Sequence, residues 1–225
     1  MGKDASPNIA PIESRTVRNV DPCRTPVSRV ELRSAIGRAY RRVTGQAPSS
    51  STLDTLTAQA SLETASGSRM YNFNFGGVKG AGPHGQTANC MTHEVIGSHD
   101  TVVRQGFRAY ASIDEGAEDY VRLLSGRFGG AMSKAQTGDL DGFAHALKTA
   151  GYYTASESDY ASALHSLSGQ PASAATNGLR PAPTTAEALA TAGSNYSTAD
   201  DLSRVLDALS SSALRIAGPA HDDST

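Results

Sequence analysis

Apolar side chains recur at the spacing of an α-helix in several separate stretches of the chain. In one stretch, the apolar positions from Leu53 to Ala60 follow this spacing, and Ser51 stands in capping-box-like spacing to Asp54. A helix is therefore expected to begin near Ser51 and to end at Gly67. The same spacing predicts four further helices. The first contains Val30, Leu32, Ile36 and Tyr40 and runs up to Gly45; the second contains Ala117, Tyr120, Val121 and Leu124; the third contains Leu140, Phe143, Ala144 and Leu147; and the fourth contains Tyr160, Ala163, Leu164 and Leu167.

Between positions 69 and 108 the pattern changes to short alternating runs. The runs 92–96 and 101–107 are joined by Gly97-Ser98-His99-Asp100, a composition typical of a β-hairpin. Together the patterns predict a mainly α (α+β) fold, in which a helical domain carries a small β-hairpin lobe.

The two ends of the chain differ in composition from the centre. Residues 1–26 mix proline with polar residues and show no periodicity, so we expect an N-terminal arm before a domain at 27–168. Residues 169–198 are rich in Ala, Ser, Thr, Pro and Gly, and they predict a linker because they bury too little apolar surface to fold alone. Residues 199–225 are expected to form an amphipathic helix and a tail, and this helix either docks on the domain or faces a partner.

The charge balance argues against polyanionic partners. The formal net charge is −2 and the sequence pI is about 6.3, so the chain is expected to bind neither nucleic acid nor an anionic membrane. No stretch approaches the roughly 20 apolar residues that span a bilayer. The N-terminus lacks the apolar core of a classical signal peptide, so either export uses another route or the signal lies outside this sequence.

Glu63 is the main candidate for chemistry. It lies seven positions after Leu56 and three after Ala60, which places it beside the buried stripe in the last turn of the predicted helix. The negative end of the helix dipole and partial burial both oppose ionisation there. The pKa of Glu63 is therefore expected to be raised, and its carboxyl to act as a proton donor. The alternative is a solvated glutamate at a helix end.

Several short segments resemble one enzyme family in order and spacing. AQASLET at 58–64 and NFGGVK at 74–79 resemble the catalytic helix and following loop of bacterial endo-β-N-acetylglucosaminidases, the flagellar and autolysin type of peptidoglycan hydrolase. THE at 92–94, FRAY at 107–110, DYVRLL at 119–124, AGY at 150–152 and DYA at 159–161 resemble later segments of that family. The resemblance covers about residues 50 to 168.

The resemblance implies a lysozyme-like helical domain that cleaves the glycan of peptidoglycan after N-acetylglucosamine. By position, Glu63 matches the catalytic acid, Glu94 the second carboxylate on the hairpin, and Tyr152 the active-site tyrosine. Two simpler alternatives stay open: Glu94 pairs with a cation such as Arg104, and Tyr152 packs in the core.

The chain departs from the family where sugar-stacking aromatics are usual. Family members carry Ser-x-Trp/Tyr-Gly after the glutamate and Asn-Leu-Phe-Gly-Ile-Lys in the loop, but this chain has no tryptophan and carries Gly76 in place of that phenylalanine. Tyr71, Phe73 and Phe75 are expected to supply the platform instead. Asn74 is expected to shape the substrate loop, with a purely structural turn as the alternative.

No metal or cofactor is expected. His84, Cys90, His93, Glu94 and His99 lie in one region, but their spacing matches no standard closed zinc site. Cys23 and Cys90 either form one disulfide in an oxidising compartment or remain independent thiols.

The sequence thus predicts a glycoside hydrolase that acts on peptidoglycan strands in the bacterial periplasm or cell wall. A lytic transglycosylase or muramidase on the same fold, and a non-catalytic glycan-binding module, are the alternatives. The route of delivery is open between an injected antibacterial effector, a phage component and a flagellar enzyme. An effector would have an immunity or secretion protein as its partner.

Overall fold

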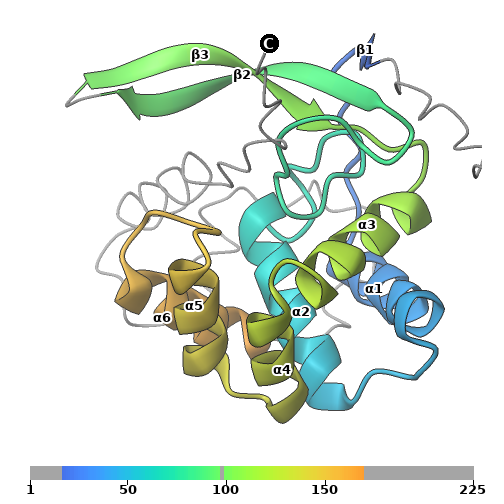
Figure 1. The fold of residues 1–225 in the computed structure, drawn as a ribbon, viewed down its shortest axis with the longest axis vertical. Helices are drawn as coiled ribbons and strands as arrows, with labels where there is room; N and C mark the ends of the chain where they lie inside the picture. Colours follow the sequence, from blue (N-terminus) through green and yellow to red (C-terminus); the bar gives the residue numbers. More distant parts are fainter. Residues whose placement is uncertain (1–16, 97–98, 170–225) are drawn as a thin grey trace, which may run out of the picture.

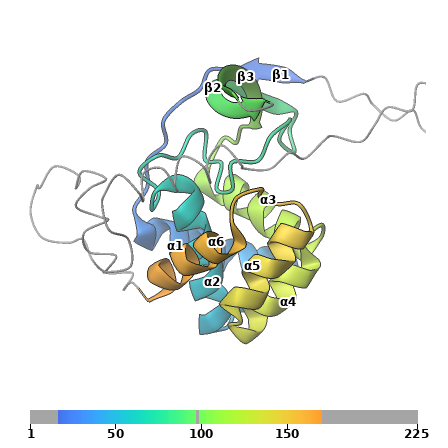
Figure 2. The same cartoon turned by 90° about the vertical axis from the view of Figure 1, so that its left-hand side faces the viewer.

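The computed structural model describes residues 17–96 and 99–169, and it consists of a helical part and a three-stranded sheet (Figure 1). Figure 2 shows the sheet above the helices, with the long loop between α2 and β2 lying between the two parts. In chain order the elements are β1 Arg18–Val20, α1 Arg29–Thr44, α2 Ser50–Thr64, β2 Gln86–Ile96, β3 His99–Arg108, α3 Ile113–Ser125, α4 Gly129–Thr137, α5 Leu140–Thr149 and α6 Glu157–Ser168. The predicted fold class, mainly α with a small β-hairpin lobe, is confirmed.

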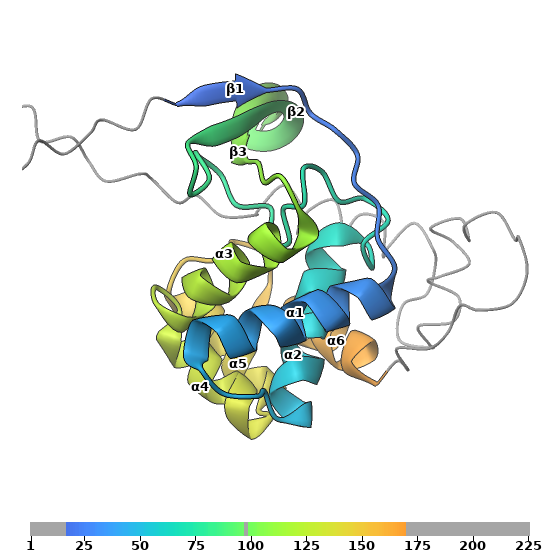
Figure 3. The ribbon, with the colours of Figure 1, turned by 90° about the vertical axis from the view of Figure 1, so that its right-hand side faces the viewer.

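Helix α2 is the central helix of the domain. It contacts α1, α4 and α6, and Figures 1 and 3 show helices on several sides of it. Leu56, Ala58 and Ala60 are completely buried, and so are the polar side chains of Thr57 and Gln59. Because almost every face of α2 is covered, its polar residues must find hydrogen-bond partners inside the protein.

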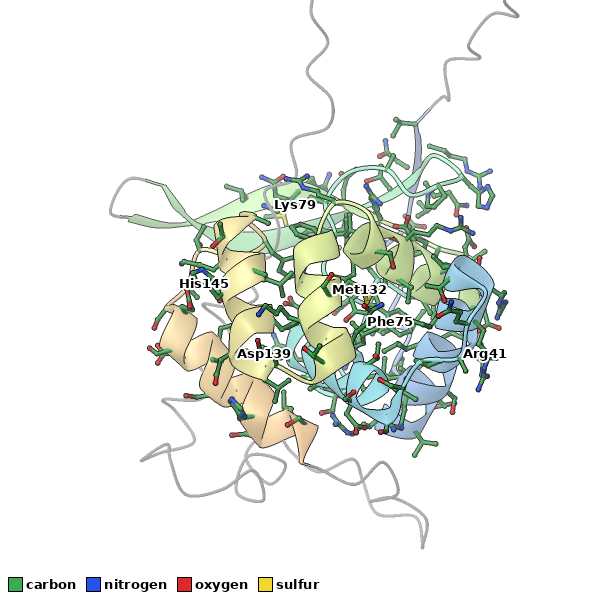
Figure 4. All side chains as sticks on the ribbon, turned by 60° about the horizontal axis from the view of Figure 1, so that its bottom comes forward. Arg41, Phe75, Lys79, Met132, Asp139 and His145 are labelled. Carbon is green, nitrogen blue, oxygen red and sulfur yellow. The ribbon has the colours of Figure 1, made fainter. Side chains whose placement is uncertain are left out.

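The core fills the space between α2 and the surrounding helices. Figure 4 shows Met132 and Phe75 toward the middle of the helical part, whereas Arg41 and His145 lie at its edge. The largest fully buried side chains include three tyrosines, Tyr120, Tyr152 and Tyr160. A buried tyrosine needs a partner for its hydroxyl, so these residues place polar groups deep inside the domain.

The predicted hairpin is confirmed and is longer than the sequence pattern indicated. Strands β2 and β3 pair in antiparallel fashion, from Thr87 opposite Arg108 to Ile96 opposite His99. His99 and Asp100, which the sequence assigned to the turn, belong to β3. On the other side of β2, β1 pairs with residues 86–88 in parallel.

The ends of α2 differ from the prediction. Ser49, not Ser51, caps the helix, because its side chain accepts the backbone N–H of Thr52. The helix ends at Thr64 rather than at Gly67. Three residues in the left-handed region then turn the chain: Ala65, Ser66 and Gly67, with φ of 47°, 54° and 90°. Gly67 is required there, since a Cβ atom would lie 2.3 Å from the Val27 carbonyl oxygen.

Two elements were not predicted from the sequence. Helix α4 begins with Gly129 and Gly130 and has no side-chain cap at its N-terminus. Strand β1 lies in the segment assigned to an N-terminal arm, of which residues 17–26 fall in the described part of the chain. Most of the predicted linker and all of the predicted C-terminal helix lie outside the described residues. None of the described helices has the length and apolar character of a membrane span.

Candidate active site

A groove runs between the end of α2, the loop that follows it, and strands β2 and β3. Its volume is about 570 Å³, and Glu63 forms part of its lining. The other lining residues come from the segment before α1, the end of α2, the loop and the sheet: Pro22, Leu62, Thr64, Ala65, Arg69, Tyr71, Asn72, Asn74, Gly77, Ala88, Asn89, Cys90, Met91, Phe107 and Arg108. A carboxyl group and an exposed aromatic ring therefore share one open groove.

Glu63 lies in the last turn of α2, where its side chain is partly buried. Its Oε1 atom accepts hydrogen bonds from Gln59 Nε2 (3.2 Å) and from the Tyr160 hydroxyl (3.3 Å). Burial raises the pKa of Glu63 to about 8, although the hydrogen bonds from Tyr160 and Gln59 lower it. The raised pKa agrees with the sequence prediction. A carboxyl with this pKa keeps its proton at neutral pH and can donate it.

A buried polar network lies beneath Glu63. Besides Glu63, Gln59 Nε2 donates to the Tyr152 hydroxyl at 2.8 Å, and the Tyr120 hydroxyl donates to Gln59 Oε1. Burial, together with the nearby Glu63 carboxyl, raises the pKa values of Tyr120, Tyr152 and Tyr160 well above their usual range. These tyrosines thus remain neutral hydroxyl groups at neutral pH.

The sequence pattern indicates only part of this network. It singles out Tyr152, but it marks Tyr120 and Tyr160 only as positions with helical spacing and gives Gln59 no role near the carboxyl. One signal was present: Gln59 stands four residues before Glu63, so the two side chains share a face of the helix. A polar residue on the inward face of a helix predicts a buried partner.

Tyr152 lies below the groove rather than in its wall. Its side chain is 1% exposed, and its hydroxyl donates to the Gly76 carbonyl at 3.2 Å. The ring packs edge-to-face on Phe128, with centroids 5.1 Å apart. Tyr152 reaches Glu63 through Gln59, so its predicted part in catalysis, which stays a prediction, would be indirect.

The loop residues predicted to bind substrate separate into two groups. Tyr71 is 43% exposed and lines the groove. Phe75 is in the core, where it stacks on Tyr120 with centroids 5.9 Å apart, so its ring is not exposed to the groove. Phe73 packs against the same core, and it is not among the lining residues. Of the three predicted aromatics, the structure places Tyr71 alone in the groove wall.

Asn74 fixes the shape of the loop under the groove. Its Nδ2 atom donates to the carbonyls of Val78 and Arg108, each at 3.0 Å, and its Oδ1 atom accepts the N–H of Val78 at 2.9 Å. Lys79 then forms an isolated bridge with Phe107. Asn74 thus joins the loop to the end of β3, as expected for the structural turn that the sequence left open as an alternative. Asn74 also lines the groove.

The segment from Phe107 to Leu124, part of the family resemblance, joins the sheet to the helices. Asp119 of α3 accepts the Tyr110 hydroxyl at 2.5 Å and pairs with Arg108 at 2.8 Å. Burial, together with the neighbouring Asp119, raises the pKa of Tyr110 above its ordinary value. This contact holds the end of β3, and with it one wall of the groove, on α3.

Glu94 lies on β2, opposite Thr101 in the register. Its side chain lies outside the description, so its predicted role as second carboxylate stays a prediction.

Cys23 and Cys90 are both free thiols in the structure. Within the described part of the chain, no group of three or more His, Cys, Asp or Glu residues is arranged to hold a metal ion.

Comparison with known proteins gives one family match. The family described as mannosyl-glycoprotein endo-beta-N-acetylglucosaminidase (Glucosaminidase) matches residues 49–171. Among curated proteins, the comparison finds no match.

Several solved structures also align with the chain. A peptidoglycan hydrolase mutant from Sphingomonas sp. A1 is 26% identical over 64% of this chain and 94% of that chain, with a TM-score of 0.47. A C-terminally truncated glycoside hydrolase domain from Salmonella typhimurium FlgJ is 26% identical over 63% and 95%, with a TM-score of 0.42. The catalytic domain of the autolysin Auto from Listeria monocytogenes is 23% identical over 64% and 84%, with a TM-score of 0.48.

Proposed function

Because this chain belongs to the glucosaminidase family of glycoside hydrolases, we propose that it cleaves the glycan strand of peptidoglycan after N-acetylglucosamine, with Glu63 as general acid. The observation that carries this proposal is the position of Glu63, which lines an open groove and has a pKa raised to about 8. Hydrolysis of a glycosidic bond requires a carboxylic acid that protonates the leaving oxygen. Glu63 meets this requirement at neutral pH.

The second half of the reaction needs a group that activates water or stabilises the developing positive charge on the sugar ring. We propose Glu94 of β2 for this role, because the family resemblance places a second carboxylate there and because β2 forms one wall of the groove. A hairpin that bends toward the helices would bring Glu94 nearer to a bound strand. The alternative is assistance by the N-acetyl group of the substrate, with Glu94 in a positioning role.

Digestion of purified cell walls tests the assignment of Glu63. Glu63→Gln preserves the size of the side chain and removes the acidic proton, so cleavage should fall by about 10²–10⁴-fold or more. Glu118→Gln is a matched control that should digest walls like the unaltered protein, because Glu118 of α3 pairs with Arg42 of α1 and is not among the residues that line the groove. Equal clearing by Glu63→Gln and the unaltered protein would exclude Glu63 as the acid.

Mass analysis of the fragments identifies the bond that is cut. A reducing N-acetylglucosamine end is the expected product. A 1,6-anhydromuramic product would instead identify a lytic transglycosylase, and a reducing muramic acid end a muramidase. Binding of glycan strands without any cleavage would identify a glycan-binding module.

We further propose that the protein is a delivered antibacterial effector, acting in the periplasm or cell wall of the target cell. The basis is the composition of the predicted arm at 1–26 and of the predicted linker and tail at 169–225, on either side of the domain. An effector of this kind requires an immunity protein that blocks the groove in the producing cell. Purification from that cell without a small inhibitory protein, and with full activity on walls, would contradict this proposal.

A further inference from the structure

Gln59 is a buried amide in the middle of α2 that contacts Glu63 directly. Its side chain has no exposed surface, and it hydrogen-bonds to Glu63 and to the hydroxyls of Tyr120 and Tyr152. A fourth and longer contact, 3.4 Å, joins Gln59 Nε2 to the Tyr160 hydroxyl. An amide buried among hydroxyl groups has its orientation set by the directions in which those groups donate.

The Gly76 carbonyl determines these directions. A carbonyl oxygen can only accept, so the single hydroxyl proton of Tyr152 points to Gly76 at 3.2 Å. The Tyr152 oxygen must then accept from Gln59, which identifies the atom 2.8 Å away as the amide nitrogen. Gln59 Oε1 accordingly faces Tyr120, and the second N–H of the amide points to Glu63 Oε1 at 3.2 Å.

The two oxygens of Glu63 are therefore not equivalent. Oε1 accepts from both Gln59 and Tyr160, so a proton placed on Oε1 would displace one of these donors. Oε2 has no hydrogen-bond partner among the residues that the structure describes, and Glu63 lines the groove. The proton of the neutral carboxyl thus resides on Oε2, the oxygen left free for a ligand.

We propose that Gln59 is a positioning residue that, together with Tyr160, keeps Glu63 Oε1 unprotonated and so presents the acidic proton on Oε2 to the groove. This inference rests on the proposed role of Glu63 as general acid and extends it to the groups that direct its proton. Gln59 itself touches no substrate, because it is buried beneath the carboxyl.

Gly76 leaves room for the Tyr152 hydroxyl in this network. A Cβ atom at Gly76 would lie 2.8 Å from the Tyr152 hydroxyl, so a larger residue at this position would crowd the hydroxyl that donates to the Gly76 carbonyl. Position 76 is also where this chain departs from the phenylalanine usual in its family. In this chain the smaller residue leaves room for the contact that determines the orientation of Gln59.

Gln59→Met tests the proposal with little disturbance of the core. Methionine has a similar volume and carries no donor for Glu63. Every tyrosine keeps an acceptor: Tyr120 the Leu56 carbonyl at 3.0 Å, Tyr152 the Gly76 carbonyl, and Tyr160 the Glu63 carboxyl. Tyr160→Phe removes the other donor and retains the ring stacked on Tyr153, so it serves as a second, independent variant.

The readouts are the pH profile of kcat on cell-wall glycan and the ¹³C titration of the Glu63 carboxyl. Since the hydrogen bonds from Gln59 and Tyr160 lower the pKa of Glu63, loss of either donor should move the alkaline limb of kcat and the titration to higher pH. The kcat at the optimum should fall by about 10–100-fold, because the proton is no longer directed to the leaving oxygen. A residue with only a structural role would lower stability without moving the limb.

Tyr153→Phe is the matched control. It removes another buried tyrosine hydroxyl, bonded to the Ala144 carbonyl, that does not contact Glu63, so both readouts should stay unchanged. The proposal is overturned if Glu63→Gln is inactive while Gln59→Met and Tyr160→Phe retain both the kcat and the limb of the unaltered protein. Activity in Glu63→Gln would instead overturn the proposed function itself.

Discussion

At the scale of single residues, the raised pKa of Glu63 favours its proposed role as proton donor but lowers stability at high pH. Burial raises its pKa from the ordinary value of 4.5 to about 8, and this keeps the proton in place at neutral pH. At higher pH the folded protein must hold a buried negative charge that the unfolded chain exposes to water. The raised pKa on which the proposed proton donation depends thereby makes the fold sensitive to pH.

Glu63→Gln is therefore expected to stabilise the protein at alkaline pH. The pKa of Glu63 is higher in the folded protein than in the unfolded chain. Its contribution to the free energy of unfolding is therefore present in full below pH 4.5 and is lost as the pH rises through about 8. The loss has an upper limit of about 5 kcal/mol, from the rise of 4.5 to about 8 at about 1.36 kcal/mol for each pH unit. The measurement is urea denaturation at pH 5, 7 and 9, with the advantage of Glu63→Gln growing with pH. The exposed carboxylate variant Asp21→Asn is the control, and a constant difference at all three pH values would contradict the expectation.

Tyr71 offers a second prediction at this scale. It is the exposed aromatic in the groove wall, and the chain has no tryptophan that could stack on a sugar in its place. Tyr71→Ala should raise KM for glycan strands by about 10-fold, with a smaller change in kcat, because it removes a binding surface remote from the proton transfer. Thermal unfolding should change little, since the ring is exposed.

Tyr71→Phe separates the ring from the hydroxyl. If stacking is the contribution of Tyr71, the phenylalanine variant keeps a KM near that of the unaltered protein. A KM unchanged in Tyr71→Ala would remove Tyr71 from the binding surface and leave the platform to other lining residues.

At the scale of elements, the sequence predicts those helices and strands whose pattern is strong and local. The spacing of Leu53, Leu56 and Ala60 indicates helix α2, and alternating runs indicate the β2–β3 hairpin, because both signals are local. Helix α4 does not, since its buried residues Ala131, Met132 and Ala135 are few and Gly129–Gly130 precede them. Its helical form depends on packing against α2, α3 and α5, which no local pattern encodes.

In the candidate site too, the sequence predicts local features but not contacts between distant parts of the chain. The position of Glu63 on an inward helical face is readable from the sequence, because Leu56 and Ala60 define that face. Tyr152 and Tyr160 meet Gln59 from 93 and 101 residues away in the chain, and spacing contains no information on such contacts. Phe75 was placed in the groove because it is aromatic, whereas its position in the core follows from the turn made at Asn72 and Phe73, both with positive φ.

The start of α2 gives a testable difference between the predicted and the observed cap. Ser49→Ala removes the oxygen that accepts the Thr52 N–H at 3.1 Å, so it should lower the free energy of unfolding by about 1 kcal/mol. Ser51→Ala, at the position suggested by the sequence pattern, should cost less, because the Ser51 side chain does not cap the helix. Denaturant unfolding of the two variants measures this difference. The reverse order would support the capping pair read from the sequence.

At the scale of the whole molecule, the segment before α1 holds the loop that forms the groove. The backbone of Cys23 and the side chain of Asn72 bond to each other, with Cys23 N–H donating to Asn72 Oδ1 at 3.0 Å, and Thr25 N–H donates to the Met70 carbonyl at 3.0 Å. Arg24 adds a bond from its guanidinium to the Ser68 carbonyl at 2.7 Å. A segment that reads as an arm thus supports residues 68–73, which include Tyr71.

This support is needed because the loop is strained. Asn72 and Phe73 have φ of 47° and 52°, a left-handed region that asparagine adopts readily and phenylalanine seldom does, so the strain lies at Phe73. Hydrogen bonds to residues 21–25 hold both residues: Asn72 Nδ2 donates to the Asp21 carbonyl at 3.1 Å, and Phe73 N–H donates to Thr25 Oγ1 at 2.9 Å. Without these bonds the loop is free to relax to negative φ, which would displace Tyr71 from the groove wall.

Two shortened chains, 17–225 and 27–225, test this dependence. The chain that begins at residue 17 should match the full protein in KM and melting temperature, because it retains β1 and all described bonds to the loop. The chain that begins at residue 27 should lose about 2–4 kcal/mol of stability, as several hydrogen bonds of about 1 kcal/mol each disappear. Its KM should rise while the alkaline limb of kcat stays in place, since no residue from 17 to 26 bonds to Gln59 or to Glu63 in the described structure. Equal KM values for the two chains would show that the loop keeps its form without the segment, whereas a shifted limb would mean that the segment also acts on the carboxyl.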